Sequence, residues 1–162
     1  MSESRHTSAE AISAESGDPG GAGYGSPIED SETEAGPAAA PTPSILLVED
    51  DFLISMEMET GLEEAGYEVV GVAATAEDAV AIAAARRPAL VVMDIRLASA
   101  RDGVDAALEI YRTLGIRSLF ASANGDSQVR ARAAPARPLG WVAKPYRVET
   151  LLKAVEEALA GL

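Results

Sequence analysis

The chain lacks cysteine and has no apolar run long enough for a membrane-spanning helix. Without cysteine it can form neither disulfides nor thiolate-based catalytic or metal sites, and this composition weakly favours a reducing compartment. A spanning helix needs about 18 or more consecutive apolar residues. The first residues also lack the basic-then-apolar order of a signal peptide. We therefore expect a cytoplasmic protein with no membrane partner.

Basic residues are also scarce. The chain has 13 Lys and Arg against 26 Asp and Glu, which gives a formal net charge of −13. Surfaces that bind nucleic acid or anionic lipid need clustered Lys and Arg, so we expect no nucleic-acid partner. The single histidine, His6, lies in the polar N-terminal segment and is assigned no chemistry.

The composition divides the chain near residue 43. Residues 1–43 are rich in Gly, Pro and Ala and carry eight acidic residues against the single basic residue Arg5. Such a segment has too little apolar surface to offset the entropy lost on ordering, which predicts a disordered acidic tail. Residues 44–162 are rich in Val, Leu, Ile and Ala with regular periodicity, and we expect them to form one folded domain.

Strand-like and helix-like segments alternate five times through residues 44–162. Short apolar runs that suit buried strands lie at 45–48, 67–72, 89–93, 117–121 and 141–143. Helical spacing of apolar residues follows each run, at 52–64, from 75 to 87, from 102 onward, at 126–134 and at 148–159. This alternation predicts an α/β fold in which helices cover both faces of a parallel sheet.

Polar residues end three of the predicted strands. Glu49, Asp50 and Asp51 follow the first strand, Asp94 follows the third, and Lys144 with Pro145 follows the fifth. Ligands of open α/β sheets bind beyond the carboxyl ends of the strands. Crowded carboxylates repel one another unless a cation joins them, and Mg²⁺ prefers such oxygen ligands and leaves room for phosphate oxygens. The pattern therefore indicates magnesium-dependent phosphoryl chemistry.

Each of these features also has a purely structural interpretation. The acidic triplet alone would most often be a polar turn or a helix start, and Asp51 is better explained as a helix-capping or first-turn acid than as a metal ligand. Ser122 alone would be an ordinary loop serine, and Trp141 could simply pack in a core or an interface. The functional interpretation depends on the combination of the acids with Asp94 and Lys144 at these spacings.

Four motifs together resemble the receiver domains of two-component response regulators. They are ILLVEDD, VVMDIRL, the hydroxyl residue in FASAN, and WVAKPY. Asp94 lies 44 residues after Asp50, and Lys144 lies 22 residues after Ser122. The resemblance covers residues 44–162 and implies a flavodoxin-like, doubly wound (βα)5 fold with a five-stranded parallel sheet in the order 2-1-3-4-5.

The resemblance also implies a role for each site residue. Asp94 would be the nucleophile that a histidine kinase or histidine phosphotransferase phosphorylates, a covalent route open to carboxylates. Mg²⁺ would be held by Asp50, Asp94 and the backbone carbonyl of Arg96, with Glu49 acting directly or through water. The remaining roles are a phosphoryl contact through Lys144, a hydroxyl donor at Ser122, a moving aromatic at Trp141 and a structural residue at Pro145.

Two functions from different classes fit this pattern. The first is a single-domain response regulator in a two-component system or phosphorelay, which catalyses only its own phosphorylation and dephosphorylation and switches the binding of a downstream protein effector. The second is a Mg²⁺-dependent phosphohydrolase or phosphotransferase of small molecules with an aspartate nucleophile. Enzymes of the haloacid-dehalogenase type carry a second acid two residues after the nucleophile, whereas Arg96 stands there in this chain. The sequence therefore favours the response regulator.

Overall fold

The computed structural model describes residues 39–123 and 126–162. Residues 39–43 have no regular secondary structure, and the rest of the predicted disordered tail lies outside the described residues. Within the described part of the chain, no helix has the length and apolar character required to cross a membrane.

Five strands alternate with five α-helices in the described residues. The strands are β1 (Ser44–Val48), β2 (Glu68–Ala73), β3 (Leu90–Asp94), β4 (Ser118–Ser122) and β5 (Gly140–Ala143). The helices are α1 (Phe52–Glu64), α2 (Ala76–Arg86), α3 (Gly103–Leu114), α4 (Ser127–Ala133) and α5 (Val148–Ala160). A single 3₁₀ turn, η1 (Ala134–Ala136), follows α4 and contains Pro135. Proline has no amide N–H and is tolerated in the first turn of a helix, so it suits this end of α4.

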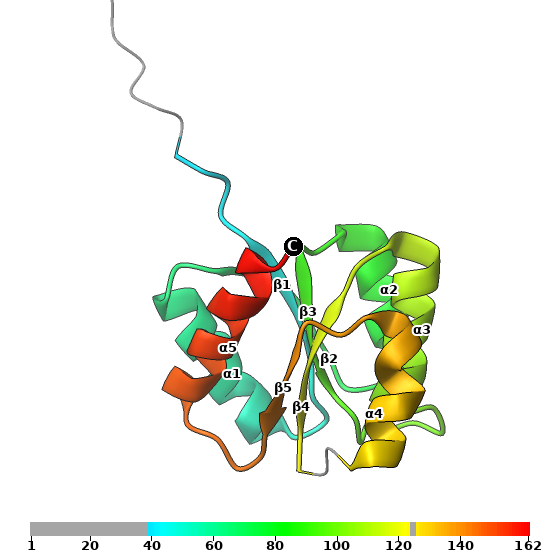
Figure 1. Ribbon diagram of the computed structural model, residues 1–162. Helices are drawn as coiled ribbons and strands as arrows, with labels where there is room; N and C mark the ends of the chain where they lie inside the picture. The colour runs from blue at the N-terminus through cyan, green and yellow to red at the C-terminus, as the bar shows by residue number, and fades with distance from the viewer. Residues whose placement is uncertain (1–38, 124–125) are drawn as a thin grey trace, which may run out of the picture. The chain divides into compact units, whose positions relative to one another are not determined.

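The strands form one parallel sheet in the order β2-β1-β3-β4-β5, which confirms the predicted topology. Helices α1 and α5 cover one face, and α2, α3 and α4 cover the other (Figure 1). Each face has its own apolar core. Ile45 and Leu47 of β1 point into the core beneath α1 and α5, whereas Leu46 and Val48 point into the opposite core. Alternate residues of a strand face opposite sides of a sheet, so a central strand that is apolar throughout supplies both cores.

The helix starts are set by side-chain caps that accept backbone N–H bonds. Asp51 caps α1, Thr75 caps α2 and Asp126 caps α4, each through its side-chain oxygen. Asp102 caps α3 in a reciprocal pair with Asp105, in which each side chain accepts the other residue's backbone N–H. These bonds satisfy donors at the start of a helix that have no partner within it. The interpretation of Asp51 as a helix-capping acid is confirmed.

A close backbone approach joins the start of α3 to the end of β3. The Gly103 N–H donates to the carbonyl of Ile95 at 2.7 Å, and a Cβ added at Gly103 would lie 1.8 Å from the carbonyl oxygen of Asp94. Only glycine leaves room for such an approach. The start of α3 is therefore packed directly against the backbone of Asp94.

Candidate functional site

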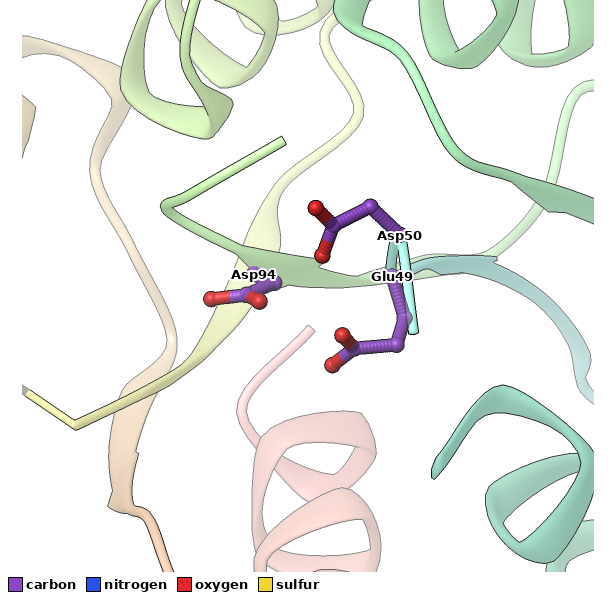
Figure 2. A group of neighbouring side chains, drawn as sticks. All are labelled: Glu49, Asp50 and Asp94. Carbon is purple, nitrogen blue, oxygen red and sulfur yellow. The ribbon is translucent and has the colours of Figure 1, made fainter. Parts of the chain in front are cut away.

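Three carboxylates meet at the carboxyl ends of β1 and β3. Glu49 and Asp50 directly follow β1, and Asp94 is the last residue of β3. Each residue offers an oxygen within 4.8 Å of oxygens of the other two, and Figure 2 shows the side chains of Glu49 and Asp50 directed toward Asp94. Glu49 and Asp94 are buried, while Asp50 is exposed. A cluster of hard oxygen donors that is open on one side fits a divalent cation that retains water or phosphate ligands.

Lys144 connects this cluster to the end of β5. Its Nζ bonds Glu49 Oε2 and lies 2.9 Å from Asp94 Oδ2. Because β5 is two strands away from β3, this contact needs a long side chain that reaches across the end of β4. Lys144 therefore supplies the positive charge that lets two buried carboxylates remain side by side.

Burial and ion pairing act in opposite directions on this pair. Burial has the largest effect on Glu49 and raises its pKa, and the hydrogen bonds from Lys144 and the Asp51 N–H offset only part of that rise. At Lys144, burial alone would lower the pKa, but the bonds to Glu49 and Asp94 outweigh it and raise the pKa. The two outcomes differ because Lys144 bonds two carboxylates that both favour its charged form, whereas Glu49 bonds one ammonium group and is repelled by Asp94.

Tyr146 lies near the cluster, two residues after Lys144. Burial raises the pKa of Tyr146 to about 12, and its hydroxyl contacts the sulfur of Met58 at 3.3 Å. Between its ordinary pKa of 10.0 and about 12, the unfolded chain loses this proton while the folded protein keeps it, so the free energy of unfolding should fall as the pH rises.

Replacing Tyr146 by phenylalanine should remove this contribution. Urea unfolding at several pH values between about 10 and 12 would then show that the free energy of unfolding falls less steeply with pH in the variant. The difference between the two slopes should correspond to about one proton. The loss that remains belongs in part to Lys144, whose raised pKa gives a stabilisation that is also lost above its ordinary value of 10.5. Identical slopes for the two proteins would contradict the assignment to Tyr146.

The structure also places the other predicted site residues. Ser122 ends β4, between Asp94 on β3 and Lys144 after β5; it is buried, and its carbonyl accepts the Lys144 N–H at 3.0 Å. Arg96 is exposed, and its backbone N–H lies 3.4 Å from Asp94 Oδ1. The peptide bond between Lys144 and Pro145 is cis. These residues all surround the carboxyl ends of β3, β4 and β5.

Trp141 lies apart from the carboxylates, on the face covered by α2, α3 and α4. Its ring stacks on Phe120 with a centroid separation of 4.6 Å and an interplanar angle of 17°. On its other side, the guanidinium carbon of Arg130 lies 4.7 Å from the ring centroid. The ring also borders a small hollow, which is lined by Ser122, Arg130, Trp141, Val142 and Ala143. Trp141 is therefore a half-buried residue that packs against the ring of Phe120 and the guanidinium group of Arg130, and it borders the same hollow as Ser122.

Two arginines of α4 were not predicted to have specific contacts. The sequence pattern indicates a solvated helix face for Arg130 and Arg132, but Arg130 packs over Trp141 and Arg132 bonds Asp102 and Asp105 at the start of α3. The spacing of Asp102 and Asp105, three residues apart, is a usable signal for the reciprocal cap. No comparable signal marks Arg132, because its partners depend on how two helices pack.

Comparison with known proteins identifies this architecture. The model of the response regulator receiver domain family matches residues 45–156. The transcriptional regulatory protein PdtaR of Mycobacterium tuberculosis is 39% identical over 118 residues, which are 72% of this chain and 56% of the relative. The phyllosphere-induced regulator PhyR of Methylorubrum extorquens is 33% identical over 137 residues, covering 83% of this chain and 51% of the relative. This chain thus spans about half the length of these two relatives.

A solved structure gives the same result. The signal receiver domain of a modulated diguanylate cyclase from Desulfovibrio desulfuricans G20 superposes with a TM-score of 0.68 at 33% identity, over 74% of this chain and 95% of that domain. None of the relatives supports the small-molecule phosphohydrolase that the sequence left as an alternative. The family match covers most of the chain, and the relatives are response regulators. The chain belongs to the receiver domain family of two-component response regulators.

Proposed function

We propose that Asp94 is the phosphoacceptor of this receiver domain. One Oδ oxygen of Asp94 attacks the phosphorus of a phosphohistidine, the O–P bond forms, the P–N bond breaks, and the imidazole leaves with the bonding electron pair. The observation that carries this proposal is the contact of 2.9 Å between Lys144 Nζ and Asp94 Oδ2, beside two further acids at the sheet edge. A carboxylate in this position can act as a nucleophile and can share its surroundings with the incoming phosphoryl charge.

Mg²⁺ is the cation that suits this reaction and this set of donors. Glu49, Asp50 and Asp94 provide the carboxylates, and the backbone carbonyl of Arg96 is the fourth candidate donor. Bound there, the ion neutralises charge on the transferring phosphoryl group. The protein groups do the rest: Asp94 supplies the nucleophile, Lys144 donates to a phosphoryl oxygen as a compact point charge, and Ser122 donates its hydroxyl to another.

The start of α1 provides a docking surface for the phosphodonor. Phe52, Leu53 and Met56 are 74%, 69% and 48% exposed, although they are large apolar side chains. They begin directly after the Asp51 cap, beside the carboxylates, so a protein that covers them lies next to Asp94. Every charged side chain within α1 is acidic. The complementary surface on a histidine kinase or phosphotransferase would be apolar with a basic rim.

Phosphorylation would then change the binding of a downstream protein effector. Engagement of Ser122 by the phosphoryl group draws the end of β4 toward Asp94, next to the hollow that Trp141 borders. Such a switch biases two arrangements of the surface formed by α4, β5 and α5. The domain would work in the cytoplasm and would catalyse its own phosphorylation and dephosphorylation, with no other substrate.

The test is whether labelling by acetyl phosphate requires Mg²⁺ and the acidic cluster. Removing the ion with EDTA should abolish labelling, and Asp50→Asn should weaken it by about 10²-fold or more, the usual cost of one group that stabilises transition-state charge. Raising the Mg²⁺ concentration should partly restore the variant, because the site loses affinity for the ion. Intact-mass spectrometry gives the number of phosphoryl groups per chain.

Asp51→Asn is the matched control, because it removes the same charge from the adjacent residue while asparagine still caps α1. Its labelling should match that of the unaltered protein. Full labelling in EDTA would reject the metal site. Steady release of phosphate from many different phosphate esters that are not acyl phosphates would reject the signalling role in favour of a hydrolase.

A further inference from the structure

Helix α4 is held in place by few apolar contacts. It is seven residues long, and of these only Ala133 is buried and Val129 is half-buried, while the other five residues are exposed. Two helical turns are too short to be stable without tertiary contacts. The position of α4 therefore depends strongly on the polar contacts that it makes with its neighbours.

Arg132 provides such a contact with the start of α3. Its Nη2 lies 2.5 Å from Asp102 Oδ1 and 3.4 Å from Asp105 Oδ1. Burial alone would raise the pKa of Asp102, but the bonds from Arg132 and the Asp105 N–H outweigh it and lower that pKa. Asp102 is therefore ionised at neutral pH, and one guanidinium joins both acids of the α3 cap.

Asp102, one of these acids, adjoins a residue that packs on the phosphoacceptor. Asp102 precedes Gly103, whose position is in contact with the carbonyl oxygen of Asp94. On the opposite side of the site, Ser122 ends β4, and α4 begins five residues later at Ser127. Arg132 thus ties α4 to the segment that packs on Asp94, while the other end of α4 follows the strand that ends in Ser122.

We infer that Arg132, Asp102 and Asp105 form a latch that holds α4 against α3 while Asp94 is an unmodified carboxylate. This inference rests on the proposed phosphorylation of Asp94. It concerns how strongly the contact between α4 and α3 opposes that phosphorylation. In this inference, the arrangement in which Ser122 bonds a phosphoryl group displaces α4 from α3, and the latch opposes that displacement. By linkage, a contact that favours the unmodified arrangement lowers the affinity for the phosphoryl group by the same factor.

The latch can be tested by the affinity of the full chain for beryllofluoride, an inorganic phosphoryl mimic, in excess Mg²⁺. Arg132→Gln should raise that affinity about twofold to fivefold, the range expected for a partly exposed ion pair. Asp102→Asn keeps a good cap residue and should have a similar effect. The double variant should bind no more tightly than either single variant, because both substitutions break the same interaction. Isothermal titration calorimetry measures these affinities.

Arg112→Gln is the matched control, since it removes a positive charge from the last turn of α3, where it lies exposed. Its affinity for beryllofluoride should equal that of the unaltered protein. An unchanged or lower affinity in Arg132→Gln, with normal binding by the unaltered chain, would overturn the latch.

Hydrogen exchange separates the latch from the proposed function. Without any phosphoryl mimic, the α4 amides of Arg132→Gln should exchange about twofold to fivefold faster than those of the unaltered protein. If the unaltered protein binds no beryllofluoride, the phosphoacceptor assignment fails, and this exchange still decides whether the latch exists. Equal exchange rates in the two proteins would reject the latch.

Discussion

Exchanging Asp94 for asparagine is expected to abolish phosphorylation by acetyl phosphate or by a cognate kinase, with a loss of about 10³-fold or more. An amide cannot replace the carboxylate as the attacking nucleophile. The fold should survive, because the asparagine keeps an oxygen near Lys144 and removes one of three crowded negative charges. The free energy of unfolding should therefore remain equal or increase. Intact-mass spectrometry and urea unfolding measure the two effects.

The chemistry of the phosphoryl bond gives a second criterion for Asp94. An acyl phosphate is a mixed anhydride that hydroxylamine cleaves, whereas a phosphate ester of serine or threonine resists it. Label on the unaltered protein should be released by hydroxylamine, and Asp51→Asn should retain the label. Undiminished, hydroxylamine-resistant label on Asp94→Asn would move the acceptor to a hydroxyl side chain.

The strands of this domain were predictable because their residues are apolar without interruption. β1, β3 and β4 lie within one or two residues of the ranges that the sequence predicts. Each is central in the sheet and faces a core on both sides, so nearly every position must be apolar. The edge strand β2 pairs with β1 through a register shift between Ile45 and Leu46, which periodicity alone does not specify.

The cluster of site residues was predictable for a related reason. The carboxyl ends of parallel strands meet at one edge of the sheet, so Glu49, Asp50, Asp94 and Lys144 come together although 95 positions separate the first from the last. Once the strands are known, the positions of these residues directly after the strands are sufficient to predict that their side chains come together. Their juxtaposition is confirmed, whereas the roles in phosphorylation and metal binding stay predictions.

The contacts of α4 were beyond the reach of sequence patterns. Arg130 and Arg132 lie two residues apart on a short helix and contact different elements, β5 and α3. Which acid or ring each arginine meets depends on the angle at which α4 packs, and that angle is set by side chains far away in the sequence. The environment of Trp141, between Phe120 and Arg130, was unpredictable for the same reason.

These contacts give the domain two kinds of polar interaction around one acceptor. Lys144 bonds Glu49 and Asp94 inside the site, and any phosphoryl group on Asp94 competes for that ammonium group. Arg132 bonds the cap of α3 outside the site, at 46% side-chain exposure. Removing the inner cation should therefore have much larger consequences than removing the outer one, since ion-pair strength rises with burial.

Replacing Lys144 by methionine is expected to weaken beryllofluoride binding by about 10-fold to 100-fold, the range for one hydrogen bond to a charged group. It should also destabilise the fold by about 3 kcal/mol at neutral pH, the lower end of the range for removing one partner of a buried ion pair. The cause is Glu49, whose side chain is 2% exposed and would lose its cationic partner. Methionine fills a similar volume, so packing is largely retained.

The pH dependence of this loss identifies its origin. The pKa of Glu49 is already raised by burial, and removing Lys144 takes away the main effect that opposes the rise. The pKa should therefore rise further in the variant, and the folded variant should bind a proton at a higher pH than the unaltered protein does. Between these two pKa values, the stability difference should shrink as the pH falls, because protonation of Glu49 removes the unpaired charge.

A double-mutant cycle with Glu49→Gln completes the test of Lys144. Glutamine keeps the shape of the side chain without the charge, so Lys144→Met combined with Glu49→Gln should recover most of the stability that Lys144→Met loses. The weakened binding of beryllofluoride should persist in the double variant, because that loss concerns the missing ammonium group itself. If the double variant is as unstable as Lys144→Met, or if the loss of stability is independent of pH, the buried charge of Glu49 is not its cause. Lys144 would then stabilise the fold mainly through its bond to Asp94, and its bond to Glu49 would contribute little.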